Sequence, residues 1–372
     1  MSLGDKDGLN LSKGEEKELA LDLLREWWMT TFQALNDVAG DERSGKLLAP
    51  YSVNANIAMS RNLPQILGVH EISMETGALT LEIVNRLLLD TTCHTMRRGK
   101  REIRTESKGC CMKGYSWPFC QSGCGFGGKA FAETFWPDVD YQLTKSLGRG
   151  DTYCSWAWND KSIPDDGDTK ESGIESLTIP EDQENELSLH FLGEFWTITI
   201  RAYVDFAGSE GTINQLAPYM RHSGMSVGIQ LKKQYKIGSD LESLIAIFKM
   251  IGKMHHIKGT IVESSNSLEC EVNECPFSDG PMELCQQYGS FFNGLLEAIN
   301  PDFEFVYDKM VTKGDTICHW TIRKKNGPDR NKQVGEKTKL GESALELLKM
   351  RLINEEITPE HYRLLRDLLL EK

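Results

Sequence analysis

Gly150-Asp151-Thr152-Tyr153-Cys154-Ser155-Trp156 recurs later in the chain as Gly314-Asp315-Thr316-Ile317-Cys318-His319-Trp320. A Gly-Asp pair is a common turn signal, and the residues around both pairs are of the kinds that favour strands. We expect the glycine to supply a positive φ and the aspartate to hydrogen-bond the turn backbone. Each copy therefore predicts a hairpin. The predicted strands are Val139 to Ser146 with Tyr153 to Trp158, and Phe303 to Met310 with Ile317 to Arg323.

The repeat extends well beyond the two hairpins. Leu48-Ala49-Pro50-Tyr51 recurs as Leu216-Ala217-Pro218-Tyr219, and residues before it match at the same spacing. After a short deletion the register resumes and holds to the hairpin. The further matches are Glu26 with Glu194, Trp28 with Trp196, Asp37 with Asp205, Cys111 with Cys275, Gly125 with Gly289, Glu133 with Glu297 and Lys145 with Lys309. Identities in this order predict a tandem duplication.

Each copy predicts an α+β domain in which three helices pack on an antiparallel sheet. The apolar spacing places the helices at Leu19 to Val38, Leu79 to Leu89 and Cys120 to Phe135 in the first copy, and at Leu189 to Phe206, Leu241 to Met254 and Met282 to Ile299 in the second. The third helix of each copy is expected to stop before Pro137 or Pro301, because proline cannot continue a helix.

The composition along the chain divides it into five segments. Residues 159–186 are rich in Asp, Glu, Ser, Gly and Pro, and are expected to form a mobile linker because they have little apolar surface to bury. The predicted segments are a first repeat at 1–158, the acidic linker at 159–186, a second repeat at 187–325, a polar connector at 326–340 and a C-terminal two-helix tail at 341–372.

Charge and hydropathy exclude several classes of protein. The net charge is −13 and the pI is near 5.2, which argues against direct nucleic-acid binding. The one basic run, Arg97 to Lys108, is interpreted as a solvated face. The N-terminus has no apolar signal region, and no stretch reaches the roughly 20 apolar residues of a membrane span. We therefore expect a cytoplasmic protein without membrane association, whose ten cysteines are reduced.

The end of the second repeat resembles known families. ECPFSDGPMELCQQYGSFFNGLLEAINPDFEFVYDKMVTKGDTICHWTI, residues 274–322, resembles the shared core of the L-2-amino-thiazoline-4-carboxylic acid hydrolase family and the 4-vinyl-reductase-type ligand-binding domain. Asn300-Pro301, Lys309 and Gly314-Asp315-x-x-Cys318 look most like the hydrolase family. Residues 110–158 are a weaker second example. INEEITPEHY, residues 353–362, looks like the SHOCT (short C-terminal) domain.

The resemblance implies a pocket between helices and sheet that takes a small, partly apolar molecule. Phenol-sensing regulators of the vinyl-reductase type also hold a structural zinc there. Cys285 and Cys318 match the first and last zinc ligands in the second copy, and Cys120 and Cys154 match them in the first. The strand positions differ, with Met310 or Ser146 where the families have a cysteine. A zinc or another thiolate-bound metal therefore stays open as an alternative.

Three kinds of site follow from these residues. Ligand-binding residues are predicted at Tyr288, Phe291, Phe292, Tyr307 and Trp320. Metal ligands are predicted at Cys275, Cys285 and Cys318, and at Cys120, Cys124 and Cys154, with plain core thiols as the alternative. An enzyme would use Cys285 or Cys318 as thiolate and Glu297 as base. The acidic residue that the hydrolase family places one helical turn after the first cysteine is Gly289 here, and Gly125 in the other copy, which counts against hydrolysis.

The sequence thus predicts a small-molecule-binding or sensing protein with a pocket in one or both repeats. The second copy is favoured because its family match is closer. The alternatives are a hydrolase that cleaves a C–N bond in a small heterocycle or amide, and a metal or cofactor carrier. The C-terminal tail is expected to mediate oligomer or protein-partner contacts, because two short helices cannot form a core alone.

Overall fold

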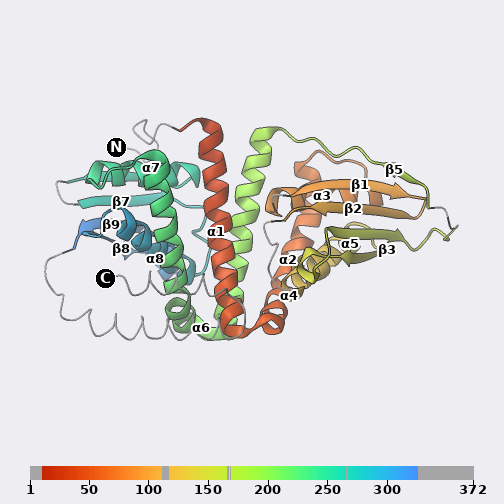
Figure 1. Ribbon diagram of the computed structural model, residues 1–372, viewed down its shortest axis with the longest axis horizontal. Coiled ribbons are helices and arrows are strands. Elements are labelled where there is room, and N and C mark those ends of the chain that lie inside the picture. The colour runs from red at the N-terminus through yellow and green to blue at the C-terminus, as the bar shows by residue number, and fades with distance from the viewer. Residues whose placement is uncertain are drawn as a thin grey trace. The chain divides into compact units, whose positions relative to one another are not determined.

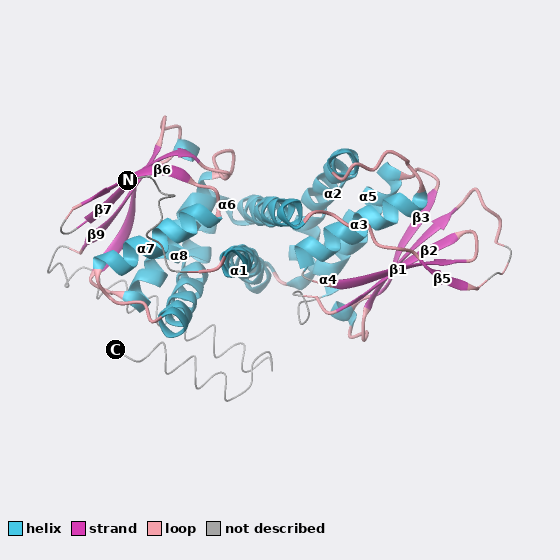
Figure 2. Ribbon diagram, turned by 90° about the horizontal axis from the view of Figure 1, so that it is seen from above, coloured by secondary structure: helices cyan, strands magenta, loops and turns pink. Residues whose placement is uncertain are grey.

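The computed structural model describes residues 11–325 except 90, 111–116, 166, 168, 265 and 266. The predicted connector at 326–340 and the predicted two-helix tail at 341–372 lie outside the described residues. Residues up to Arg323 form one compact unit. It is an α+β fold with two antiparallel sheets, as Figures 1 and 2 show. We call the part from α1 to β5 the first half and the part from α6 to β9 the second half.

The sheet of the first half has the strand order β3-β4-β2-β1-β5, and that of the second half has the order β6-β7-β9-β8. The first sheet comprises β1 (Thr92–Arg98), β2 (Glu102–Lys108), β3 (Val139–Lys145), β4 (Cys154–Asp160) and β5 (Glu171–Gly173). The second comprises β6 (Lys258–Glu263), β7 (Ser267–Glu274), β8 (Phe303–Lys309) and β9 (Cys318–Lys324). The predicted hairpin partners β3 and β4 do pair antiparallel, and so the first predicted hairpin is confirmed.

The helices lie against these sheets and between them (Figure 2). They are α1 (Lys13–Ala39), α2 (Asp41–Ile66), α3 (Met74–Leu89), α4 (Trp117–Cys120), α5 (Gly128–Phe135), α6 (Glu181–Tyr235), α7 (Leu241–Met254) and α8 (Met282–Ile299), with a π-helical stretch η1 at Gln121–Gly127. The six predicted helices are present. Both third helices end where expected, α5 at Phe135 and α8 at Ile299, directly before the Pro137 and Pro301 turns.

Two helical segments were missed by the sequence analysis. They are α2 and the part of α6 after Gly208, where the backbone leaves helical geometry at φ 72°. Each contains a proline in its interior, Pro50 or Pro218. The buried face of α2 consists largely of small and polar residues such as Ser52 and Asn56. Because no continuous apolar stripe exists, the helical periodicity that the sequence analysis searched for is weak there.

Glycine sets how closely α6 and α8 approach. A Cβ on Gly224 of α6 would lie 1.9 Å from the carbonyl oxygen of Phe291, and a Cβ on Gly294 of α8 would lie 1.8 Å from that of Arg221. No side chain fits in that space. The two helices therefore pack backbone against backbone, which brings the aromatic residues of α8 against the rest of the core.

Helix α1 contacts the cores of both halves through two adjacent tryptophans. The Trp27 ring centroid lies 5.0 Å from that of Tyr288 and 5.1 Å from that of His255, in the second half. The Trp28 ring lies 6.0 Å from Phe119, in the first half. Full burial lowers the pKa of His255 to about 3, so its neutral ring can pack on Trp27.

Helix α1 and the first part of α6 are joined by hydrogen bonds that run in both directions. Trp28 Nε1 donates to Thr199 Oγ1 at 3.1 Å, and Trp196 Nε1 donates to Thr31 Oγ1 at 2.9 Å. Near the C-terminal end of α1 and of the first part of α6, two tyrosine hydroxyls donate hydrogen bonds to carboxylates of the opposite half. Tyr51 donates to Asp205 at 2.6 Å, and Tyr219 donates to Asp37 at 3.0 Å.

The predicted mobile linker at 159–186 instead carries ordered elements. Strand β5 pairs with the outer edge of β1, and the backbone N–H of Ile174 donates to Thr95 O at 3.0 Å. Ile179 is buried, and α6 begins at Glu181. The prediction of a mobile linker was wrong because it counted only apolar side chains. Backbone hydrogen bonds to a sheet edge require none.

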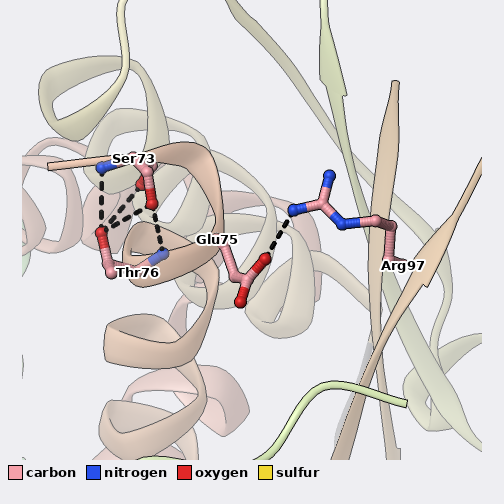
Figure 3. Close-up of polar contacts among 4 residues, drawn as sticks. All are labelled: Ser73, Glu75, Thr76 and Arg97. Carbon is pink, nitrogen blue, oxygen red and sulfur yellow. Dashed lines mark hydrogen bonds and ion pairs between the residues drawn. The ribbon is translucent and has the colours of Figure 1, made fainter. Parts of the chain in front are cut away.

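The basic run around β1 and β2 is matched by acidic neighbours. Arg97 Nη2 lies 2.5 Å from Glu75 Oε2 on α3, which ties this helix to the sheet (Figure 3). At the start of α3, Ser73 Oγ accepts a hydrogen bond from Thr76 N, and Ser73 N donates to Thr76 Oγ1. The Glu75 carboxylate therefore extends from a well-capped first turn.

Gly224→Ala should destabilise the fold by at least about 2 kcal/mol, because the new methyl group overlaps a backbone carbonyl of α8. Gly14→Ala is the control, since no atom lies within 4 Å of the position of its Cβ. Denaturant unfolding of both variants measures the effect. Equal stability of the two would contradict the backbone contact between α6 and α8.

Candidate functional site

The turn between β3 and β4 in the first half has the same geometry as the turn between β8 and β9 in the second half. A short 3-10 stretch leads to Gly150 at φ 89° in the first half and to Gly314 at φ 96° in the second. The Asp151 carboxylate accepts a hydrogen bond from Ser146 N at 2.8 Å, and the Asp315 carboxylate accepts one from Met310 N at 2.8 Å. The roles predicted for glycine and aspartate in this turn are confirmed.

The cysteine of each signature also belongs to the turn. Cys154 Sγ accepts a hydrogen bond from Leu147 N at 3.4 Å, and Cys318 Sγ accepts one from Val311 N at 3.3 Å. Both side chains are buried. In each half the cysteine sulfur of the signature therefore contacts the backbone that precedes the turn. One thiol lies beneath each turn as a result.

Beneath the first turn lies a small cavity of about 20 Å³. It is bounded by η1 and α4 on one side and by strands of the first sheet on the other. Its walls are almost entirely apolar apart from sulfur. Four cysteines lie around it together with two aromatic rings, and these six residues are Cys110, Cys120, Cys124, Cys154, Phe119 and Trp156. The cavity thus lies between helical elements and the sheet of the first half.

The helical wall of the cavity is the π-helical stretch η1. Cys120 precedes it and Cys124 lies within it, among glycines. Tyr141 on β3 donates a hydrogen bond from its hydroxyl to Cys124 O at 2.8 Å, which fixes the backbone at this cysteine. Ser122 donates to Phe119 O at 2.9 Å on the same stretch. Short π-helical stretches occur frequently at functional sites.

Three of the thiols around the cavity, those of Cys120, Cys124 and Cys154, stay protonated at neutral pH. Burial raises the pKa of Cys154 to about 11, and also raises the pKa of Cys120. Desolvation raises the pKa of Cys124 well above its usual range, and the neighbouring Cys120 raises it further. Because the thiolate is the reactive form, these groups are weak nucleophiles in this state.

Trp156 contributes an unused donor to the wall. Its ring is 2% exposed, and its Nε1 has no hydrogen-bond partner among the described residues. A buried N–H without an acceptor costs free energy, roughly 1–3 kcal/mol. Trp156 is one of the residues that line the cavity.

The second half has three cysteines beneath its turn. Burial raises the pKa of Cys275 to about 12, and it raises the pKa of Cys285. Cys318 acts on both of them electrostatically and is therefore close to both. The three cysteines predicted in the second half are thus close to one another. The residues around them differ from those around the cysteines of the first half.

The predicted ligand-binding residues pack on one another and on their neighbours. The Tyr288 and Phe292 ring centroids are 4.4 Å apart, and Phe291 lies 5.7 Å from Phe292. Phe305, which the sequence analysis did not select, lies 5.0 Å from Tyr307 and 5.4 Å from Trp320. In this state the five residues belong to an aromatic core.

The predicted base Glu297 is engaged in an ion pair. Arg221 Nε donates to Glu297 Oε2 at 2.8 Å, and Arg221 Nη2 contacts the other carboxylate oxygen. This hydrogen bonding raises the pKa of Arg221. The Arg221 guanidinium thus contacts both carboxylate oxygens of Glu297, and burial raises the pKa of the Cys285 thiol. The structure does not bring these residues together as a nucleophile and a base.

Over the part of the chain that the structure describes, no three His, Cys, Asp or Glu side chains are grouped so that they could hold a metal ion. Cys120, Cys124 and Cys154 line one cavity, but they do not form a ready site for a metal with three or four protein ligands. Cys111 lies outside the described residues. Over the same residues, no helix has the length and apolarity needed to cross a membrane.

A polar groove of about 310 Å³ between α1 and α6 was missed by the sequence analysis. Four carboxylates from one face of α1 line it. Their spacing of three or four residues in the sequence could have indicated that they share a helix face. They are Glu15, Glu18, Asp22 and Glu26. Glu15 caps α1 through Ser12, and Glu26 accepts a hydrogen bond from Ser223 at 2.8 Å. Part of this acidic surface therefore serves the packing of the helices.

Comparisons with protein-family models, with curated proteins and with solved structures find no match to this chain.

Asp315→Ala should lower the free energy of unfolding by about 1–3 kcal/mol, because Met310 N loses a charged acceptor in the turn. Asp302→Ala, at an exposed position in the loop before β8, is the control and should change stability little. Chemical denaturation measures both. An equal effect of the two substitutions would show that the carboxylate does not hold the turn.

Cys154 should be alkylated about 100-fold more slowly in the native chain than in the unfolded chain at pH 7.5, since raising the pKa from 9.0 to about 11 lowers the thiolate fraction by that factor. Iodoacetamide labelling followed by peptide mass spectrometry gives the rate for each cysteine. Native labelling at the unfolded rate would contradict this protonation state.

Proposed function

We propose that the two halves are the copies of a tandem duplication. The reciprocal contacts support this. Trp28 and Trp196 are matched positions in the sequence repeat, and each donates to a threonine of the opposite copy. Tyr51 and Tyr219 are likewise matched, and each donates to an aspartate of the opposite copy. Two related copies that pack about an approximate two-fold axis would make contacts of this isologous kind.

We propose further that the protein binds or senses a small ligand, and that the ligand site is the cavity of the first half. The observation that carries the proposal is a difference in side-chain size. In the register of the repeat, Cys124 corresponds to Tyr288, and Leu143 corresponds to Tyr307. At these two positions the second half has large aromatic side chains, whereas the first half has smaller side chains that line its cavity. Packing therefore favours the first copy, whereas the family match favoured the second.

The protonation states support binding over hydrolysis. Burial raises the pKa values of Cys154 and Cys275, which keeps both thiols neutral at pH 7, and Glu297 is held by Arg221. The apolar walls and neutral thiols of the cavity favour contact with an apolar group of a ligand, and at about 20 Å³ the cavity must widen to admit an organic molecule. The resemblance to the vinyl-reductase-type domain supports a ligand site at this place in the fold.

The remaining parts of the proposal concern the setting of the protein. We propose a cytoplasmic protein, for which buried, protonated thiols such as Cys154 and Cys270 are suited. Oligomer or partner contacts through the C-terminal segment from residue 341 are proposed on the resemblance to the SHOCT domain and on the apolar spacing of that segment.

Native mass spectrometry of the purified wild-type chain should show a non-covalent adduct of one small ligand. Cys124→Tyr should remove this adduct, because it introduces the residue that fills the corresponding space in the second half. Cys285→Ser is the matched control and should keep the adduct, since Cys285 lies in the other half. Thermal unfolding verifies that both variants fold.

An adduct that persists on Cys124→Tyr would place the ligand elsewhere. A wild-type chain without any adduct, and without stabilisation by small aromatic probes such as phenol, would contradict a binding function for this cavity.

A further inference from the structure

The cavity of the first half is too small for an organic molecule as it stands. About 20 Å³ is room for one body of roughly the size of a water molecule. An organic ligand therefore enters only if one of the walls moves. The walls are the sheet, the helical wall formed by α4 and η1, and the turn between β3 and β4, which contributes Ser146 and Leu147.

The sheet and the helical wall are held from behind. Strands β2 and β4 pair along their length. On the helical wall, α4 lies so close to α2 that a Cβ on Gly45 would be 2.7 Å from Pro118 O. At the end of η1, a Cβ on Gly127 would be 2.6 Å from Ser52 Oγ of α2. Helix α2 thus holds both ends of the helical wall through contacts too tight for a methyl group.

The turn at residues 146–151 differs from these walls, because hydrogen bonds within it make it a unit of its own. Arg149 N donates to Ser146 O at 2.9 Å, and the Asp151 carboxylate accepts from Ser146 N at 2.8 Å. At its base the pairing of β3 with β4 shifts register between Leu143 and Lys145. Such an irregularity disrupts the ladder locally. The turn can therefore move as one piece about its base.

One contact joins this turn to the helical wall. The guanidinium carbon of Arg149 lies 4.2 Å from the ring centroid of Trp117, the first residue of α4. The turn and α4 also face the same cavity, which Leu147 and Phe119 line. Arg149 is exposed, and a cation–π contact at an exposed site is weak.

We propose that the turn at residues 146–151 is a lid over the first-half cavity, and that the contact of Arg149 with Trp117 holds the lid closed. The proposal rests on the proposed function and names how the ligand of the same site is admitted. The lid pivots at the irregular pairing of β3 and moves Leu147 away from Phe119. Because the closing contact is weak, the lid opens without unfolding of the sheet.

Iodoacetamide labelling of Cys154, which lies beneath the lid, measures its opening in the full chain without any ligand. Trp117→Leu and Arg149→Met should each raise the labelling rate of Cys154 about two- to fivefold, the factor by which loss of an exposed cation–π contact shifts an opening equilibrium. Lys145→Met is the matched control. It removes a cation–π contact with Tyr153, at 4.1 Å in the same hairpin, and should leave the rate unchanged.

Cys318 lies beneath the matched turn of the second half, and its labelling reports unfolding of the whole compact unit. Its rate should stay unchanged in all three variants. A rate at Cys154 that does not rise in Trp117→Leu and Arg149→Met, or that rises by the same factor as the rate at Cys318, would overturn the lid. Labelling needs no ligand. The lid can therefore fail while the native adduct persists, and the adduct can be absent while the lid opens.

Discussion

The carboxylates of Asp151 and Asp315 each accept a hydrogen bond from a backbone N–H five residues earlier in the chain. This bond closes the loop between β3 and β4 in the first half and between β8 and β9 in the second, with glycine at a positive φ in the loop. The same closure turns a cysteine sulfur back toward the backbone, where it accepts a further hydrogen bond. The strand pairing, the buried thiol and the space beneath the turn all depend on this local geometry.

The helices decide what occupies that space. In the second half, glycines on α6 and α8 allow the two backbones to meet, and the aromatic residues Tyr288 and Phe292 of α8 pack on one another with ring centroids 4.4 Å apart. In the first half the corresponding helix is interrupted by the π-helical stretch η1, which presents Cys124 at this place. One turn geometry thus supports a filled aromatic core in one half and a thiol-lined cavity in the other.

Local chemistry explains which parts of the fold could be predicted from the sequence. The hairpins follow from the Gly-Asp turn, and the ends of α5 and α8 follow from the prolines that come next. Helix α2 could not be predicted from apolar periodicity, because its buried face uses residues such as Ser52, Asn56 and Ser60. Strand β5 was not predicted because it is held by backbone hydrogen bonds to β1. Such bonds leave no pattern in the side chains of the strand.

The candidate site was predicted in part. Cys120, Cys124 and Cys154 were selected from their positions in the sequence, and the structure brings them to one cavity. Trp156 was not selected, although it matches the predicted Trp320 in the repeat. The choice of the second copy rested on family likeness, which reflects the ancestry of a pocket. Whether a pocket stays open depends instead on the size of the side chains that line it.

Xenon binding in crystals tests most directly the claim that the first half alone keeps its space open. Xenon is an apolar atom that enters small dry cavities, and its anomalous scattering locates it without a chemical modification. The account predicts one xenon site, bounded by Cys120, Cys124, Cys154 and Trp156. A site beneath the Gly314 turn instead, or an equally occupied site in each half, would contradict it.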